Sequence, residues 1–160
     1  MKQVEMSKYL KFITMGIGIL FLAFVVWFLP SLLGVLVPEE AGRAGYWGAC
    51  TFIWVTAVPC ILCLGKFWGI CKRIGRDQSF TRDNASALRQ MSHYLLVDCI
   101  LYALLLAVSC IAGWYRYGIG LIFGIVLILF ICIALTVLCA VLSHLVYKAS
   151  QMQEDQDLTI

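Results

Sequence analysis

The chain has 160 residues, of which 62% are hydrophobic and only 13% charged, and its formal net charge at pH 7 is +3. A soluble domain is usually about 45–50% apolar and about 25% charged, so this composition excludes a soluble globular fold. A separate soluble catalytic domain is excluded too, because four apolar runs use most of the chain and each needs about 20 residues to cross a lipid bilayer.

Four transmembrane helices are predicted, and together they form one all-α membrane domain. A basic N-terminus, with Lys2, Lys8 and Lys11, precedes the first charge-free run. Pro30 is expected to close or sharply bend the first span, because proline lacks the backbone N–H and clashes with the preceding turn. Pro59 lies inside the second span, where a neighbouring helix can accommodate a kink. The spans are predicted at residues 12–29, 46–70, 92–112 and 119–145.

A polar connector, residues 71–91, joins the second and third spans, and we call it the elbow. It holds five of the twelve Lys and Arg residues, and its glycine and polar side chains predict a turn. Thr81 predicts a helix N-cap, because its hydroxyl can accept backbone N–H bonds. No proline or glycine follows until Gly113. One helix is therefore expected from about Arg82 to residue 112, with its first ten residues outside the bilayer.

The distribution of cations predicts the topology. The N-terminus, the elbow with the end of the second span, and the tail at residues 148–160 together hold ten Lys and Arg residues. The two opposite loops hold only Arg43 and Arg116. Cytoplasmic loops carry an excess of Lys and Arg. Both termini are therefore predicted in the cytoplasm, with a long third helix extending into it and a short, mobile, acidic tail.

Asp98 is the one ionisable side chain well inside a predicted span, and an acid at mid-helix costs about 2.5–3.5 kcal/mol on insertion scales. Tyr94 and Tyr102 lie four residues to either side and complete a polar stripe. Asp98 can be the ionisable site of a small transporter or channel subunit, or a structural acid bonded to a tyrosine or a neighbouring backbone group. The structural interpretation is favoured, because no other span contains an acid that could continue a proton path.

Two further patterns raise the question of redox or metal chemistry. Cys60 and Cys63 form a C-x-x-C motif in the second span, at a depth that lacks the polar, accessible setting a reactive thiol needs. His93 and His144 are expected at similar heights in the third and fourth spans, with no carboxylate or cysteine to complete a haem or metal site. Neither catalytic residues nor a metal or cofactor is predicted, and an enzyme is not expected.

Gly120 and Gly124 form a GxxxG pattern in the fourth span. Small residues of this kind let helices approach closely in lipid. Packing inside a four-helix bundle is favoured over a homo-oligomer interface, although the pattern fits both.

The elbow has two interpretations. Its cations can lie against anionic headgroups, at about 1 kcal/mol for each cation close to the surface. Alternatively, its cations and apolar side chains form a docking surface for a cytoplasmic protein. The residues assigned to that surface are Arg73, Arg76, Phe80, Thr81, Arg82, Asn84, Leu88 and Arg89. Composition alone does not separate the two.

The elbow sequence from Gly75 to Leu88, G-R-D-Q-S-F-T-R-D-N-A-S-A-L, resembles the signature of the YoaS-like bacterial proteins, which are small four-span membrane proteins of unknown function. The acidic C-terminus ending D-L-T-I is also similar. The resemblance implies a place in the bacterial cell membrane. Because such proteins are often encoded beside a very small helix-turn-helix regulator, it also implies a protein partner of that class, without direct contact to nucleic acid. It brings no catalytic residue.

Overall fold

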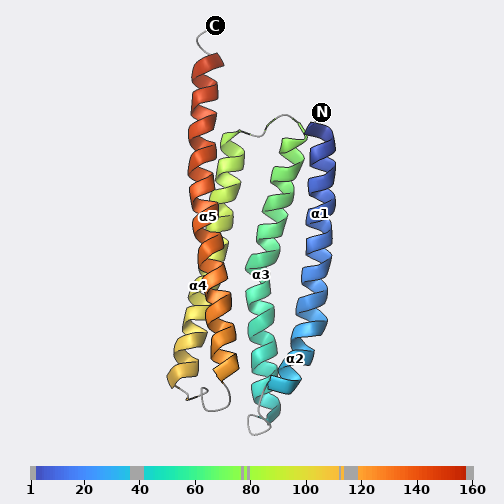
Figure 1. Ribbon diagram of the computed structural model, residues 1–160, viewed down its shortest axis with the longest axis vertical. Coiled ribbons are helices and arrows are strands. Elements are labelled where there is room, and N and C mark those ends of the chain that lie inside the picture. The colour runs from blue at the N-terminus through green and yellow to red at the C-terminus, as the bar shows by residue number, and fades with distance from the viewer. Residues whose placement is uncertain are drawn as a thin grey trace.

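The computed structural model describes residues 3–36, 42–76, 78, 80–111, 113 and 119–157. All the regular elements in these ranges are helical, which confirms the predicted all-α class. They are α1 (Gln3–Ala23), the π-helical segment η1 (Phe24–Phe28), α2 (Leu29–Leu36), α3 (Gly42–Ile74), α4 (Arg82–Ile111) and α5 (Ile119–Asp157) (Figure 1).

Four stretches of these helices are long and apolar enough to cross a membrane, as the sequence predicts. They are Lys8–Gly34, Gly45–Ile74, Arg82–Ile111 and Ile122–Asp155. Each exceeds the roughly 20 residues that a helix needs to cross the hydrocarbon core. The centres of the first and second predicted loops opposite the elbow, residues 37–41 and 114–118, lie outside the described residues.

Successive spans run antiparallel, and the start of α1 and the end of α5 lie at the same end of the molecule as the elbow (Figure 1). In the described part of the chain, α1 packs against α3, α3 against α4 and α4 against α5, with no extensive packing of α1 on α5. The four-helix bundle predicted from the sequence is therefore arranged as an open row of helices in chain order. Without a fourth interface, large apolar faces remain for lipid to cover.

Pro30 does not close the first span, which was one of the two predicted outcomes. The chain continues from α1 through η1 into α2 without leaving the helical region. In η1 the backbone N–H of Leu29 donates to the carbonyl oxygen of Phe24, one residue further back than in an α-helix. This wider turn precedes the proline, whose ring would otherwise clash with the carbonyl group four residues earlier.

The hydrophobic core lies towards the elbow end of the molecule. Side chains of α3 and α4 form it, and Cys139 and Val146 of α5 pack against it. Its buried members are Cys63, Ile70, Ala87, Leu88, Met91 and Leu95. Apart from Ser109, the buried residues of α4 all fall between Asn84 and Asp98. The elbow is thus anchored on the best-packed part of the protein.

One prediction about the polar ends differs from the structure. Residues 148–157, expected to be a mobile tail, continue α5 as a helix. Figure 1 shows α4 beginning beside the end of α3, and its predicted extension from the membrane into the cytoplasm stays a prediction. It is α5 that continues beyond the elbow. The predicted tail residues 158–160 lie outside the described part of the chain.

The GxxxG pattern does not serve close packing within the described structure. A Cβ atom added at Gly120 or Gly124 would meet no atom of another helix within 4 Å. The predicted role of these glycines in internal helix packing is therefore wrong for this arrangement.

Candidate functional site

The elbow turns sharply through hydrogen bonds to the end of α3. The carbonyl oxygen of Arg73 accepts bonds from the backbone N–H groups of Arg76, at 2.9 Å, and of Gln78, at 3.2 Å. At the start of α4 the carbonyl oxygen of Thr81 accepts bonds from the N–H groups of Asn84 and Ala85, at 3.0 and 3.2 Å. These bonds confirm the predicted turn and the predicted start of the helix.

Thr81 does not cap α4 through its side chain as predicted. Its Oγ1 atom is buried and makes no hydrogen bond to any described residue. The backbone carbonyl of the same residue accepts the first helical bonds. The helix therefore begins at the predicted position, but its start is fixed by other groups.

Asn84 is the side chain that holds the elbow together. It is 1% exposed, and its Nδ2 donates to the carbonyl oxygen of Gln78 at 2.8 Å. Its Oδ1 accepts a bond from Arg73 Nη1 at 3.4 Å. The guanidinium of Arg73 also donates to the carbonyl oxygen of Asp83 at 3.5 Å and lies 4.0 Å from its carboxylate. The end of α3, the turn and the start of α4 are thus joined through one amide.

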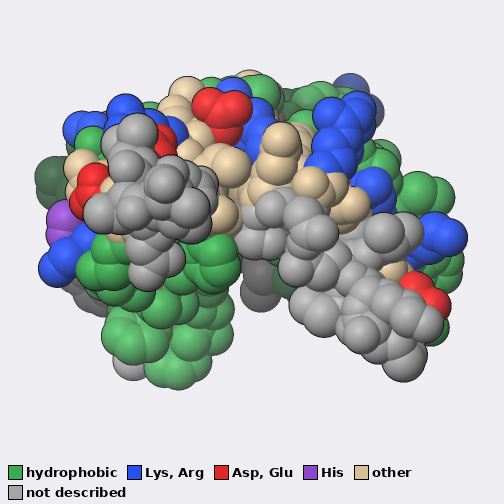
Figure 2. Space-filling view, turned by 90° about the horizontal axis from the view of Figure 1, so that it is seen from above, with side chains coloured by type: hydrophobic (Ala, Val, Ile, Leu, Met, Phe, Trp, Pro, Cys, Tyr) green, Lys and Arg blue, Asp and Glu red, His purple; other side chains and the backbone are tan. Residues whose placement is uncertain are grey.

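The eight residues predicted for a docking surface divide into two groups. Asn84 and Leu88 are buried, while Arg73 and Thr81 are partly buried, so these four shape the elbow from within. The outward group is exposed and consists of Arg76, Phe80, Arg82 and Arg89. Phe80 is 57% exposed although it lies in a polar segment. Figure 2 looks onto this end of the molecule and shows Lys and Arg side chains around its rim.

The end of α5 contributes to the elbow surface through an ion pair that was not predicted from the sequence. Arg82 forms an ion pair with Glu154 of α5. Beside this pair is a cavity of about 340 Å³, lined by Phe80 and Ser150 among others. Acidic residues in the tail and basic residues in the elbow could have indicated this ion pair. A tail predicted to be mobile was not expected to form a fixed contact.

Asp98 is buried between α4 and α3 and is 1% exposed. Its Oδ2 accepts a bond from Cys60 Sγ at 3.3 Å. Its Oδ1 has no hydrogen-bond partner among the described residues. A tyrosine or a backbone group was the predicted partner of Asp98, and a contact with the C-x-x-C motif was not predicted. The two residues lie at matching depth, fourteen residues before the end of α3 and sixteen after the start of α4.

The predicted tyrosine stripe along α4 separates in the structure. The hydroxyl of Tyr102 lies 3.5 Å from Thr56 Oγ1 on α3, and its ring packs edge-on against Phe52. Tyr94 instead packs against the hydrophobic core. The second cysteine of the C-x-x-C motif, Cys63, donates to the carbonyl oxygen of Met91 at 3.5 Å. The C-x-x-C motif therefore holds α3 to α4 with both of its thiols.

The two histidines are both exposed. The Nδ1 atom of His93 lies 2.7 Å from the carbonyl oxygen of Arg89 in its own helix. Among the described residues there is no group of three His, Cys, Asp or Glu side chains placed to hold a metal ion. The arrangement of polar groups thus concentrates at the elbow and at the Asp98–Cys60 pair.

Comparison with known proteins gives one match. No curated protein and no solved structure matches the chain. Residues 5–160 match a family described as "Protein of unknown function (DUF2975)". This match covers nearly the whole length, including the elbow, all four candidate spans and the end of α5. Its four apolar helices indicate a multi-pass membrane protein. The chain belongs to the DUF2975 family, whose function is unknown.

Proposed function

We propose that this protein is a non-enzymatic membrane protein that docks a small cytoplasmic helix-turn-helix regulator on the exposed face of its elbow. The observation that carries the proposal is Phe80, an aromatic side chain 57% exposed in a polar segment. Arg76 and Arg82 are exposed close to it in the chain. Exposed aromatic and arginine side chains are enriched at the centres of protein interfaces.

The elbow presents these side chains on a fixed support. Asn84 bonds the turn to both helices, and the core cluster lies directly beneath it. A surface that is already ordered loses little conformational entropy when a partner binds. The ion pair between Arg82 and Glu154 extends the same support to α5.

The charge distribution supports a cytoplasmic position for the elbow. Among the described residues, the Lys and Arg residues other than Arg43 lie in segments at the end that carries the elbow and both termini. An excess of cations marks the cytoplasmic side of a membrane protein. The likeness of the elbow to the YoaS-like proteins supports a bacterial cell membrane and a regulator of the helix-turn-helix class.

The test is co-purification of such a regulator with the protein in lipid nanodiscs. The variant combines Phe80→Ser with Arg76→Glu and Arg89→Glu, and it leaves the Arg82–Glu154 pair intact. We expect wild type to retain the regulator and the variant to lose most of it. A reporter fused after residue 78 checks that the elbow faces the cytoplasm in both forms.

The matched control reverses two cations on α1, Lys8→Glu and Lys11→Glu, in protein that has been purified and reconstituted. It alters charge near the same membrane surface without touching the elbow, and it should retain the regulator. Equal recovery of the regulator by wild type and the elbow variant would reject the docking surface.

The transport alternative rests on Asp98. Neither of the two cavities described between the helices includes it, because both lie at the elbow end. Its partner is a thiol of the adjacent helix. This burial supports a structural role for Asp98, and ion flux in proteoliposomes that disappears with Asp98→Asn would favour transport instead.

A further inference from the structure

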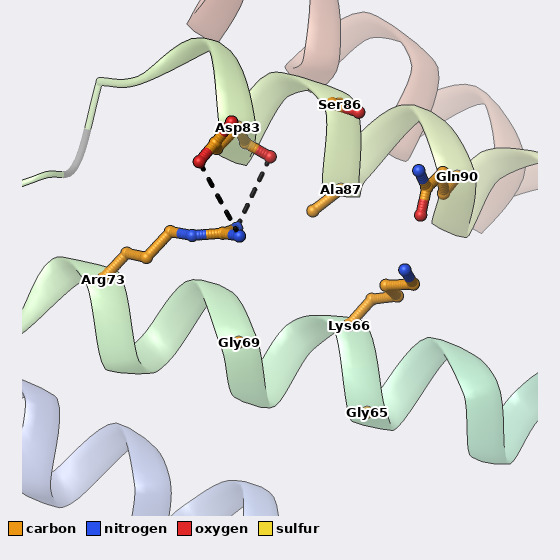
Figure 3. A pocket seen from close by; sticks show the side chains of 8 residues that line it. All are labelled: Gly65, Lys66, Gly69, Arg73, Asp83, Ser86, Ala87 and Gln90. Atoms are coloured by element: carbon orange, nitrogen blue, oxygen red, sulfur yellow. Dashed lines mark hydrogen bonds and ion pairs between the residues drawn. The ribbon is translucent and has the colours of Figure 1, made fainter.

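A second cavity lies between α3 and α4 near the elbow and has a volume of about 220 Å³. Figure 3 shows Lys66 and Arg73 pointing from α3 towards α4, with Asp83 and Gln90 pointing towards them from α4. Pockets that enclose drug-sized ligands measure about 300–1,000 Å³, so this one suits a smaller group. It is separate from the exposed docking face, because neither Phe80 nor the exposed elbow arginines line it.

The charges in this cavity favour an anion. The carboxylate of Asp83 lies 4.0 Å from the guanidinium of Arg73. The charged residues that line the cavity are thus one acid, Asp83, and two cations, Lys66 and Arg73. Lys66 forms no ion pair with any described residue. An ammonium group held between two helices near the hydrocarbon is stabilised by a counter-charge. An anion from outside the chain would supply that counter-charge.

Two glycines line the α3 side of the cavity together with Lys66 and Arg73. Gly65 and Gly69 are four residues apart and therefore lie on one helix face. A Cβ atom at either position would meet no other atom within 4 Å, so the glycines are not needed for close helix contact. Glycine is disfavoured inside a helix relative to alanine. Here the missing side chains leave open space directly beside Lys66.

The depth of the cavity indicates the source of the anion. Trp68 is 40% exposed and lies on α3 between the two cations. Tryptophan is enriched at the level of the lipid headgroups. Basic pockets between transmembrane helices at this level are suited to phosphate-containing headgroups. Asp83, Ser86 and Gln90 add acceptors and donors that suit hydroxyl groups beside the phosphate.

We infer that this cavity binds the headgroup of an anionic phospholipid of the phosphatidylglycerol type. Lys66 and Arg73 hold the phosphate, and the polar side chains of α4 face the glycerol hydroxyls. The acyl chains then lie along the apolar surface of the helix row. The site is independent of the docking function proposed for the elbow.

The test compares lipid binding by native mass spectrometry of the purified protein in a neutral detergent. Phosphatidylglycerol and phosphatidylcholine are titrated separately onto wild type, Lys66→Gln, Gly69→Leu and the control Lys72→Gln, an exposed cation on the same helix that does not line the cavity. We expect wild type to prefer phosphatidylglycerol, Lys66→Gln to weaken its binding about fivefold, and Lys72→Gln to match wild type. Gly69→Leu fills the cavity and should remove the preference.

Lys66→Gln keeps most of the side-chain stem, so it remains informative if Gly69→Leu fails to fold. Equal preference for phosphatidylglycerol in wild type and Lys66→Gln would overturn the site. An equal loss in Lys72→Gln would show general surface attraction and would also overturn it. Displacement of bound lipid by excess inorganic phosphate would assign the cavity to free phosphate and reject the lipid headgroup.

Discussion

Asn84 and Asp98 are two buried polar side chains on the same helix, and each is only 1% exposed. Asn84 uses both ends of its amide, donating to Gln78 and accepting from Arg73. Asp98 accepts one bond from a thiol, and its second oxygen has no hydrogen-bond partner among the described residues. Equal burial therefore accompanies very different degrees of hydrogen bonding.

The difference shows what each group contributes to the fold. A buried polar group stabilises a protein only when its bonds replace those it made with water. Asn84 meets this requirement and determines the path of the elbow. Asp98 has a weak donor as its partner, since a thiol donates poorly. Asn84 is thus the stronger structural element of the two, and the following variants examine that ranking.

The largest effect is expected for Asn84→Ala. The substitution removes the donor for the Gln78 carbonyl and the acceptor for Arg73, so the free energy of unfolding should fall by about 1–3 kcal/mol. Unfolding by SDS in mixed micelles measures the change. Ser86→Ala, an exposed change in the same turn, is the control and should stay close to wild type. Equal stability of the two variants would contradict the role assigned to Asn84.

A smaller effect is expected for Cys60→Ala. Loss of the thiol leaves the Asp98 carboxyl group without its bond to α3, and the free energy of unfolding should fall by about 1 kcal/mol. The double variant Cys60→Ala with Asp98→Val replaces both polar partners by apolar groups and should recover most of that loss. The same SDS titration compares the three proteins. A double variant less stable than the single one would show that Asp98 has a stabilising partner besides Cys60.

The smallest effect is expected for Thr81→Ala. Loss of a threonine N-cap usually costs about 1 kcal/mol. Here the hydroxyl makes no bond to a described residue, so the change should stay within about 0.5 kcal/mol. A full loss of the usual size would indicate that the hydroxyl caps α4 in the membrane. The matched comparison is Asn84→Ala in the same turn.

The spans and the start of α4 could be predicted because their signals are local. Apolar length identifies a span, and Thr81 followed by a long stretch without glycine or proline locates a helix start within a residue of the observed Arg82. The continuation of the first helix through Pro30 by a π-helical turn could not be predicted in this way. A wide turn before a proline depends on the backbone of the whole helix and leaves no distinct residue pattern.

The contacts of the candidate site depended on pairing between helices. The bond between Cys60 and Asp98 joins residues 38 positions apart, and the Arg82–Glu154 pair joins residues 72 positions apart. Matching depth in antiparallel helices reduces the number of residues that could contact one another. The rotation of each helix about its axis then determines which of these residues do so. That rotation is set by packing, and the low amphipathicity of nearly uniform apolar helices gives little indication of it.

The π-helical turn at Phe24–Phe28 sets the rotational phase of the first span. An α-helix turns by about 100° for each residue, so one inserted residue rotates all that follows by about that angle. In the observed phase the carbonyl oxygen of Pro30 accepts a bond from the Tyr46 hydroxyl of α3 at 3.3 Å. Deleting one residue from this turn would leave the span long enough to cross the bilayer but would swing that carbonyl away from its partner. The first span thus behaves as two helical halves whose mutual angle is fixed by a single extra residue.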